Sequence, residues 1–257
     1  MPDLNGKVVF VTGASKGIGR AISEVFATNG ATVVCASRTV ADLEIVAHNI
    51  KENGGTAIVQ QLDVSNMKDF QNSVKKVTNE LGSIDVLVNN AIMQPQHKPF
   101  NEIDEEWWDY MMNLSLKGYF FACQKASKEM VKRNTAGSLI CISSVHSFRA
   151  AKDWTPYGIA KMGIRRMVKG LAADLSGTGI NSNCIAPGAI NTFLKLIFSV
   201  SFIYILGIIW LGILIGWEKP IFKLGAEPFL LAELFKMLLL SFLTPALLKT
   251  KKLTKII

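Results

Sequence analysis

Short, mostly apolar runs recur along the first part of the chain, separated by longer segments whose apolar residues have helical spacing. The runs carry few charges, as strands buried on both faces of a sheet do. They fall at residues 7–12, 31–36, 56–62, 84–88, 138–143 and 180–185. Strands that alternate with helices predict a parallel sheet that is covered on both faces and connected by right-handed crossovers. The expected fold class is α/β, with a doubly wound, Rossmann-like sheet.

The character of the chain changes at about residue 193. Residues 196–217 contain no charge over 22 positions, enough for a helix to cross a hydrocarbon layer of roughly 30 Å. A second apolar segment, residues 229–248, is interrupted by two charges and a proline. We therefore divide the chain into a catalytic domain, residues 1–193, and an atypical hydrophobic tail, residues 194–257. Transmembrane or interfacial helices are expected in the tail, in place of the final strand region of the fold.

Three interpretations of the tail stay open. The first is membrane association through residues 196–217. The lysine-rich end then favours either a helical hairpin, which keeps those lysines in the cytosol, or a second segment along the membrane interface. The second interpretation is a shifted reading frame in an AT-rich gene, which would give the same bias toward Ile, Leu, Phe and Lys. In the third, both apolar segments are buried against the domain.

The net charge of +8 is unevenly distributed, because residues 194–257 hold eight lysines and three glutamates but no arginine or aspartate. The remaining residues show no basic stripe interleaved with aromatics, so nucleic-acid binding is not expected. The four cysteines are far apart and form no cluster with histidine, which predicts no metal site and fits a reducing compartment. The N-terminus lacks the charged start and apolar stretch of a signal peptide, so we expect a cytoplasmic catalytic domain.

A glycine-rich turn follows the first predicted strand and opens the first predicted helix. It runs from Thr12 to Gly19, with further glycines at 13 and 17. Such glycines allow a tight turn and a close approach of the backbone to a pyrophosphate, whose charge is stabilised at the helix N-terminus. Placed between a strand and a helix, the motif predicts a dinucleotide site.

Tyr157 and Lys161 stand four residues apart, thirteen residues after Ser144. Residues with this spacing share a helix face, so the Lys161 ammonium is expected to lie near the Tyr157 phenol. A nearby positive charge lowers the pKa of a phenol, which is about 10 when free. The pair therefore predicts general acid/base chemistry by Tyr157.

Together these motifs resemble the short-chain dehydrogenase/reductase family over residues 1–193. The turn resembles the family's T-G-x-x-x-G-x-G motif, and Asn89-Asn90-Ala91 resembles the segment that stabilises its central sheet. The resemblance implies that Ser144 binds the substrate oxygen, that Tyr157 transfers its proton, and that Lys161 also holds the nicotinamide ribose. It further implies that Asn113 holds a proton-relay water, which completes a catalytic set of Asn113, Ser144, Tyr157 and Lys161.

The same resemblance implies a cofactor site with three parts. The glycine turn binds the pyrophosphate, a segment after the third strand contacts the adenine ring, and a P-G-x-x-x-T segment lines the nicotinamide. The implied residues are Gly13, Ser15, Lys16, Gly17, Ile18, Gly19, Arg38, Asp63, Val64, Asn90, Tyr157, Lys161, Pro187, Gly188, Ile190 and Thr192.

The choice of cofactor is predicted from the end of the second strand. An acidic residue there would accept a hydrogen bond from the ribose 2′-hydroxyl of NAD. This chain instead has Ser37-Arg38, and Arg38 with Lys16 can bind the 2′-phosphate of NADP. NADP is the expected cofactor and NAD the second choice. The alternative interpretation is that Arg38 and Lys16 are solvated surface cations that bind no cofactor.

The predicted function is an oxidoreductase that moves a hydride between NADP(H) and a small-molecule alcohol or carbonyl substrate. His146 and Trp154 flank the predicted substrate pocket, and the run from Ser143 to His146 is similar to sugar dehydrogenases of the glucose 1-dehydrogenase type. The rival hypotheses are a non-catalytic nucleotide-binding module and an inactive product with a frameshifted C-terminus. The aromatic group Trp107, Trp108 and Tyr110 is interpreted as packing, either between subunits of a homo-oligomer or against the sheet.

Overall fold

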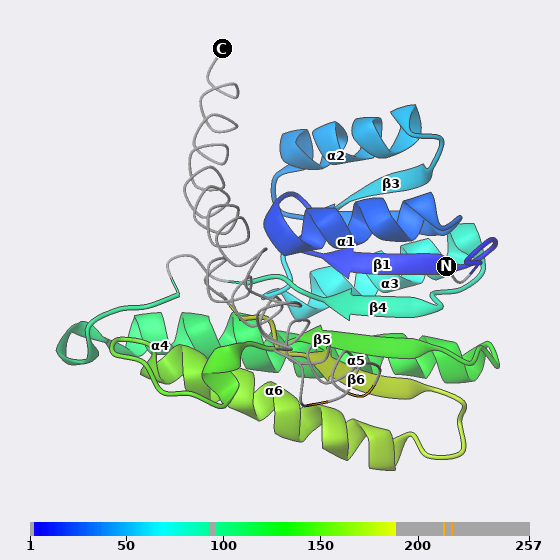
Figure 1. Cartoon of the computed structure of the whole chain (residues 1–257). Helices are drawn as coiled ribbons and strands as arrows, with labels where there is room; N and C mark the ends of the chain where they lie inside the picture. The colour runs from blue at the N-terminus through cyan, green and yellow to red at the C-terminus, as the bar shows by residue number, and fades with distance from the viewer. Residues whose placement is uncertain (1–2, 93–95, 189–212, 214–216, 218–257) are drawn as a thin grey trace. The chain divides into compact units, whose positions relative to one another are not determined.

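Parallel strands form a sheet in the order β3-β2-β1-β4-β5-β6 in the computed structural model of the protein (Figure 1). The structure describes residues 3–92 and 96–188 and, beyond these, only Ile213 and Trp217. Proximity of Cα atoms divides the chain into two units, Met1–Gly188 and Ala189–Ile257, and the sheet belongs to the first. The predicted α/β, doubly wound fold class is confirmed.

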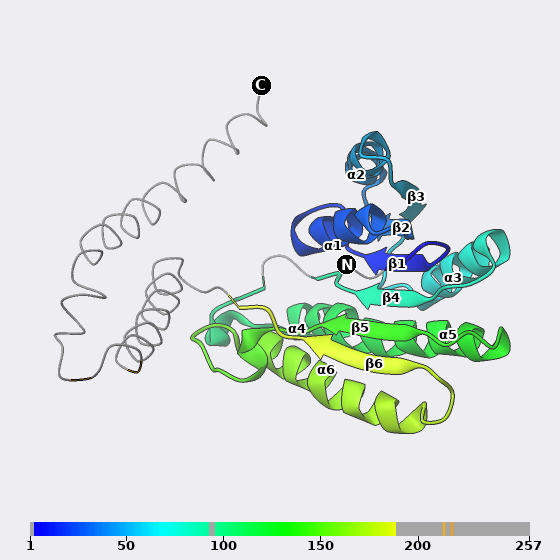
Figure 2. The same ribbon diagram turned by 45° about the vertical axis from the view of Figure 1, so that its right-hand side comes forward.

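All the predicted strands are confirmed, and their ends differ from the predicted ones by at most two residues. Each strand is parallel to its neighbours, as Figure 2 shows from a second direction. The strands are β1 (Val8–Thr12), β2 (Thr32–Ser37), β3 (Thr56–Gln61), β4 (Val86–Asn89), β5 (Ser138–Ile142) and β6 (Asn181–Ile185).

Helices connect successive strands, as the alternating pattern predicts. One of them is interrupted by a π-helical turn, η2 (Asn113–Lys117), which joins α4 to α5. The α-helices are α1 (Gly17–Thr28), α2 (Val40–Glu52), α3 (Met67–Leu81), α4 (Glu105–Met112), α5 (Gly118–Lys132) and α6 (Thr155–Asp174), and the short 3-10 turns are η1 (Phe100–Glu102) and η3 (Val145–Ser147).

Alternate residues of the central strands enter two cores, one on each face of the sheet. In β1, Val9 and Val11 pack with α1 and α2, whereas Val8 and Phe10 pack with α3, α4, α5 and α6. All four side chains are buried. Since full burial of such a side chain stabilises the fold by roughly 1.5–3 kcal/mol, both helical layers are held firmly on the sheet.

The strand order reverses beside β1, which pairs with β2 on one side and with β4 on the other. Helix α1 follows β1 onto one face of the sheet, whereas α4 follows β4 onto the opposite face. The two connections therefore separate at the carboxyl ends of the strands. Such a switch point is where open α/β sheets bind their ligands.

Strand β6 corrects one expectation, because it is not the buried strand that its sequence predicted. Asn181, Asn183 and Ile185 are exposed, and the two residues between them are only partly buried. Within the described residues β6 pairs with β5 alone and forms the edge of the sheet. A position at the edge explains why its side chains are less covered than those of the central strands.

The predicted apolar tail lies outside the described residues, apart from Ile213 and Trp217. Among the described helices, none is long and apolar enough to cross a membrane. The predicted spans at 196–217 and 229–248 are therefore not tested by this finding.

A buried carboxylate fastens the start of β1 to the start of β4. Asp85 accepts hydrogen bonds from the Val8 amide at 2.9 Å, from the Ser83 hydroxyl at 3.1 Å and from the Lys7 ammonium at 3.0 Å. Asp85 is 7% exposed, whereas the Lys7 side chain is 52% exposed. The bond to the Val8 amide is thus the one that water cannot easily replace.

We expect Asp85→Ala to lower the free energy of unfolding by about 1–3 kcal/mol, because it leaves the buried Val8 N–H without an acceptor. The matched control Lys7→Ala removes only the exposed partner and should cost less than about 1 kcal/mol. Urea unfolding of both variants and the wild type measures the difference. Equal losses in the two variants would contradict this assignment.

Candidate active site

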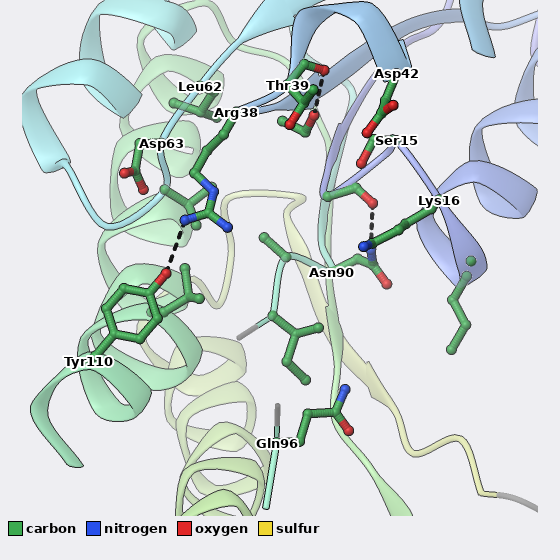
Figure 3. Close-up of a pocket in the computed structure, with 18 residues that line it drawn as sticks. Ser15, Lys16, Arg38, Thr39, Asp42, Leu62, Asp63, Asn90, Gln96 and Tyr110 are labelled. Carbon is green, nitrogen blue, oxygen red and sulfur yellow. Dashed lines mark hydrogen bonds between the residues drawn. The ribbon is translucent and has the colours of Figure 1, made fainter. Parts of the chain in front are cut away.

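A cavity of about 520 Å³ opens at the switch point between the carboxyl ends of β1 and β4 (Figure 3). It brings together nine of the residues predicted to bind the cofactor, which are Gly13, Ser15, Lys16, Gly17, Ile18, Arg38, Asp63, Val64 and Asn90. The sequence did not single out the other lining residues, Ser37, Thr39, Asp42, Leu62, Ala91, Ile92, Gln96, Tyr110 and Leu114, as cofactor contacts.

The glycine turn has the geometry that a pyrophosphate requires. Gly13 and Gly17 have φ angles of +66° and +58°, which other residues adopt only with strain. A Cβ on Gly13 would lie 2.8 Å from the Ala91 Cα, whereas a Cβ on Gly17 would meet no protein atom within 4 Å. Lys16 gives α1 no side-chain cap, and the first turn holds no acidic residue. The first amide groups of α1 therefore suit an anion, and the residues present fit a dinucleotide.

Asn90 holds the glycine turn against the end of β4. Its Nδ2 donates to the carbonyl oxygens of Thr12 at 3.1 Å and Gly13 at 3.2 Å. The Thr12 hydroxyl oxygen in turn accepts from the backbone amides of Asn90 at 2.9 Å and Ala91 at 3.2 Å. Gly19 is buried beside this contact, and a Cβ there would collide with Gly13 and Asn90. These bonds fix the turn before any ligand binds.

Two charged side chains lie at the end of the cavity formed by β2 and β3. Arg38 donates from Nη1 to the Tyr110 hydroxyl at 3.0 Å. Asp63 accepts from the Ser65 amide at 2.9 Å and from the Ser65 hydroxyl at 2.7 Å. Tyr110, which we interpreted as a packing residue, is instead part of the cavity. Tyr110 lies four residues before Leu114, which also lines the cavity, but the sequence did not single out either residue as a cofactor contact.

The structure brings Ser144, Tyr157 and Lys161 together at the end of β5. Ser144 caps η3, where its hydroxyl oxygen accepts from the His146 amide at 3.2 Å. Tyr157 and Lys161 lie on α6, and all three residues are buried. The Lys161 ammonium lies 5.6 Å from the centre of the Tyr157 ring and 5.0 Å from that of Tyr119. The predicted proximity of these groups is thus present.

Lys161 is fastened to β5 at both its side chain and its backbone. Its Nζ donates to the Ile142 carbonyl at 2.7 Å, and its own carbonyl accepts from the Ser143 hydroxyl at 2.8 Å. The residue is 1% exposed. One hydrogen bond uses only one of the three ammonium donors, so the others remain available to a ligand.

The predicted lowering of the Tyr157 pKa is wrong in this structure. Burial raises the pKa of the Tyr157 phenol above its ordinary value of 10.0, and a hydrogen bond from Ser144 opposes this only in part. Burial also lowers the pKa of Lys161 to about 7. Both shifts have one cause, since removal from water disfavours the charged form of each group. Tyr157 is therefore held as a proton donor.

Asn113 begins the π-helical turn η2, where its carbonyl accepts from the Gly118 amide. A wider turn of this kind is frequent at functional sites. A Cβ on Gly118 would lie 3.1 Å from the carbonyl oxygens of both Asn113 and Val64. The absence of a side chain at Gly118 thus lets the helix lie close to the loop after β3.

An aromatic cluster lies beside Tyr157. It includes His146 and Trp154, the two residues that we predicted to flank the substrate pocket. Their rings are stacked, with centroids 4.3 Å apart and an interplanar angle of 4°. Trp154 meets the Tyr157 ring edge-on at 5.2 Å, and His97 stacks on Trp154 at 5.1 Å. The Nδ1 atom of His146 is buried and has no hydrogen-bond partner among the described residues.

The segment after β6 approaches the same site. The Pro187 carbonyl accepts from the Val145 amide at 2.8 Å, one residue from Ser144. Gly188 packs against the Val145 side chain, because a Cβ on Gly188 would lie only 3.1 Å from the Val145 Cβ. The two remaining predicted cofactor residues, Ile190 and Thr192, lie outside the described residues.

Comparison with protein families identifies the chain, since residues 7–196 match the model of the short chain dehydrogenase family. The chain belongs to this family. Relatives within it include glucose 1-dehydrogenase 2 of Bacillus subtilis, which is 36% identical over 195 residues that span 74% of each chain. The 3-oxoacyl-(acyl-carrier-protein) reductase FabG of Thermotoga maritima is 35% identical over 189 residues, 74% of this chain and 76% of the reductase.

Solved structures that hold a nicotinamide cofactor share the fold. A metagenomic short-chain oxidoreductase in complex with NADP has a TM-score of 0.69 at 30% identity, over 73% of this chain and 85% of that one. NAD⁺-bound xylitol dehydrogenase also has a TM-score of 0.69, at 27% identity, over 73% of this chain and 72% of that one. The family fold therefore binds NAD or NADP, depending on the member.

The lowered pKa of Lys161 predicts a pH dependence of stability without added cofactor. Between the folded pKa of about 7 and the ordinary value of 10.5, the unfolded chain binds more protons at this residue, so stability rises with pH. Relative to Lys161→Met, the wild type should gain up to about 1.4 kcal/mol of unfolding free energy per pH unit above pH 7.

Urea unfolding between pH 7 and pH 9 measures this gain. The range stops there because Cys35, whose pKa burial raises from 9.0 to about 11, lowers the stability of both proteins at higher pH. A difference between the two proteins that stays constant over the range would show that Lys161 keeps its ordinary pKa in the fold.

Proposed function

We propose that this short-chain dehydrogenase transfers a hydride between NADP(H) and the hydroxyl or carbonyl carbon of a small-molecule substrate. The observation that supports this most directly is the burial of Ser144, Tyr157 and Lys161 side by side at the end of β5. A second support is the neighbouring cavity, where uncapped helix amides and two cations suit a phosphorylated dinucleotide. Residues 1–193 would hold this whole catalytic unit.

The protein's own groups would move the proton while bound NADPH supplies the hydride. The Ser144 hydroxyl donates to the substrate carbonyl oxygen and polarises it. Tyr157, kept protonated by burial, gives its proton to that oxygen as the negative charge develops. The Lys161 ammonium stabilises the phenolate that remains. In the direction of alcohol oxidation, the same phenolate accepts the proton.

Asn113 and Lys161 would connect this proton transfer to solvent. Lys161 is buried, and its pKa of about 7 allows it to release or accept a proton near neutral pH. Asn113 begins the π-helical turn that packs against α6, the helix of Lys161. A water held by Asn113 would complete the relay.

Preference for NADP is proposed from the cations of the cavity. Arg38 and Lys16 both line it, and no acidic residue follows β2 directly. An arginine guanidinium can bind a 2′-phosphate with two hydrogen bonds, whereas a 2′-hydroxyl gives it little charge to neutralise. One related structure holds NADP and another NAD⁺, so residues of this chain carry the argument.

The substrate is proposed to be an alcohol, ketone or sugar of small size. Two relatives in the family are named for glucose and for a 3-oxoacyl group on a carrier protein, which leaves a hydroxyl/carbonyl pair as the shared feature. The stacked rings of His146 and Trp154 beside Tyr157 offer a flat surface to the carbon skeleton of such a substrate.

We expect Tyr157→Phe to reduce turnover by roughly 10²–10⁴-fold, because the ring remains while the transferable proton is lost. The rate of NADPH oxidation with a panel of ketones, aldehydes and sugars measures the effect. NADPH binding, followed by fluorescence, serves as the control and should barely change. A variant that keeps more than about a tenth of the wild-type rate would rule out Tyr157 as the general acid.

Arg38→Asp should move the cofactor preference toward NAD, since it replaces a phosphate partner with an acceptor for the 2′-hydroxyl and repels the phosphate. The control Lys51→Asp makes the same change of charge at an exposed position of α2 that does not line the cavity, and it should leave the preference unaltered. Titration of NADPH and NADH against the three proteins gives the affinity ratios. An unchanged ratio in Arg38→Asp would sink the proposal for NADP.

A further inference from the structure

Arg38 and Tyr110 meet in the dinucleotide cavity although they are 72 residues apart (Figure 3). Arg38 follows β2 on one side of the cavity, and Tyr110 projects from α4 on the other. The Arg38 Nη1 donates to the Tyr110 hydroxyl at 3.0 Å. We propose that Tyr110 is a positioning residue for cofactor preference, which holds the Arg38 guanidinium ready for the 2′-phosphate of NADP. This inference rests on the proposed function.

Positioning matters here because Arg38 is exposed. A long, exposed side chain samples many rotamers, and ordering it on binding opposes affinity. A hydrogen bond to a helix residue confines the guanidinium to the cavity before the cofactor arrives. Tyr110 is well suited to this task, since its ring is carried by a helix whose buried Met111 packs in the core.

The chemical nature of the partner also matters. A carboxylate could hold Arg38 in the same place, but it would neutralise the charge that a phosphate needs. The phenol of Tyr110 is neutral and accepts only one of the five guanidinium N–H groups, which leaves enough donors for two bonds to a phosphate. In the described part of the chain Arg38 forms no ion pair, so its guanidinium is not already bound to a carboxylate.

The proposed effect is selective, because NADPH and NADH differ only in the 2′-phosphate. Removal of the Tyr110 hydroxyl should therefore weaken NADPH binding and spare NADH binding. A residue that merely supports the fold of α4 would affect both cofactors alike.

The test is fluorescence titration of the full chain with NADPH and with NADH. Tyr110→Phe, which keeps the ring, is expected to raise the Kd for NADPH by about 3- to 10-fold, the range for the loss of one typical hydrogen bond, and to leave the Kd for NADH unchanged. The control is Trp108→Phe, because Trp108 lies on the same helix with the same exposure of 37% but does not line the cavity. It should change neither Kd.

A double-mutant cycle separates positioning from direct contact. If Tyr110 acts through Arg38, then Tyr110→Phe has no further effect on NADPH binding in an Arg38→Ala background. A loss of NADPH affinity that persists in that background, or an equal loss for both cofactors, would overturn the role of Tyr110 but leave the proposed function standing. A wild-type chain that binds NADPH no more tightly than NADH would instead refute the proposed cofactor choice, and this inference with it.

Discussion

The bond between the buried Lys161 ammonium and the Ile142 carbonyl, 2.7 Å long, is the constraint on which the rest of the proposed catalytic arrangement depends. It joins α6 to the last residue of β5, and the Ser143 hydroxyl returns a second bond to the Lys161 carbonyl. Ser144 directly follows Ser143 in the chain, and Tyr157 lies one helical turn before Lys161. A single connection between a strand and a helix thus sets the positions of all three groups.

Burial gives this arrangement its chemical character. A phenol and an ammonium that are both removed from water lose part of their tendency to be charged, so the Tyr157 pKa rises and that of Lys161 falls to about 7. Relative to the free side chains, the pKa of Tyr157 is therefore higher and that of Lys161 lower. The higher pKa keeps the Tyr157 phenol protonated. A cofactor and a substrate would change the surroundings of both groups. In the proposed mechanism, desolvation as well as the proximity of charge would govern proton transfer.

The dinucleotide cavity and the catalytic groups share one edge of the sheet for a topological reason. All described strands are parallel, so the loops after β1, β4 and β5 leave the sheet at the same edge. Asn90 bonds the glycine turn to the end of β4, and Asn89 donates from β4 to the thiols of Cys123 and Cys141. The two halves of the site are consequently linked through the central strands.

The sequence predicted the strands and the site residues where the pattern has a local cause. A strand covered on both faces must be mostly apolar, as β1 is from Val8 to Val11. A helix that carries two cooperating groups on one face spaces them as Tyr157 and Lys161 are spaced. It could not predict the exposure of β6, because the apolar content of a strand does not say which neighbours cover it. Nor could it predict the contact of Arg38 with Tyr110, which depends on how α4 crosses the end of the sheet.

The most direct test of the central claim, that the buried lysine and tyrosine serve hydride transfer, is to follow deuterium from the nicotinamide into the product. The full chain would be given NADPH deuterated at C4 of the nicotinamide and a panel of carbonyl compounds, and the products analysed by mass spectrometry. We expect the wild type to form an alcohol that carries deuterium at the former carbonyl carbon, and Lys161→Met to form far less of it. The claim would be contradicted if the wild type binds NADPH but transfers no deuterium, or if Lys161→Met transfers it at the wild-type rate.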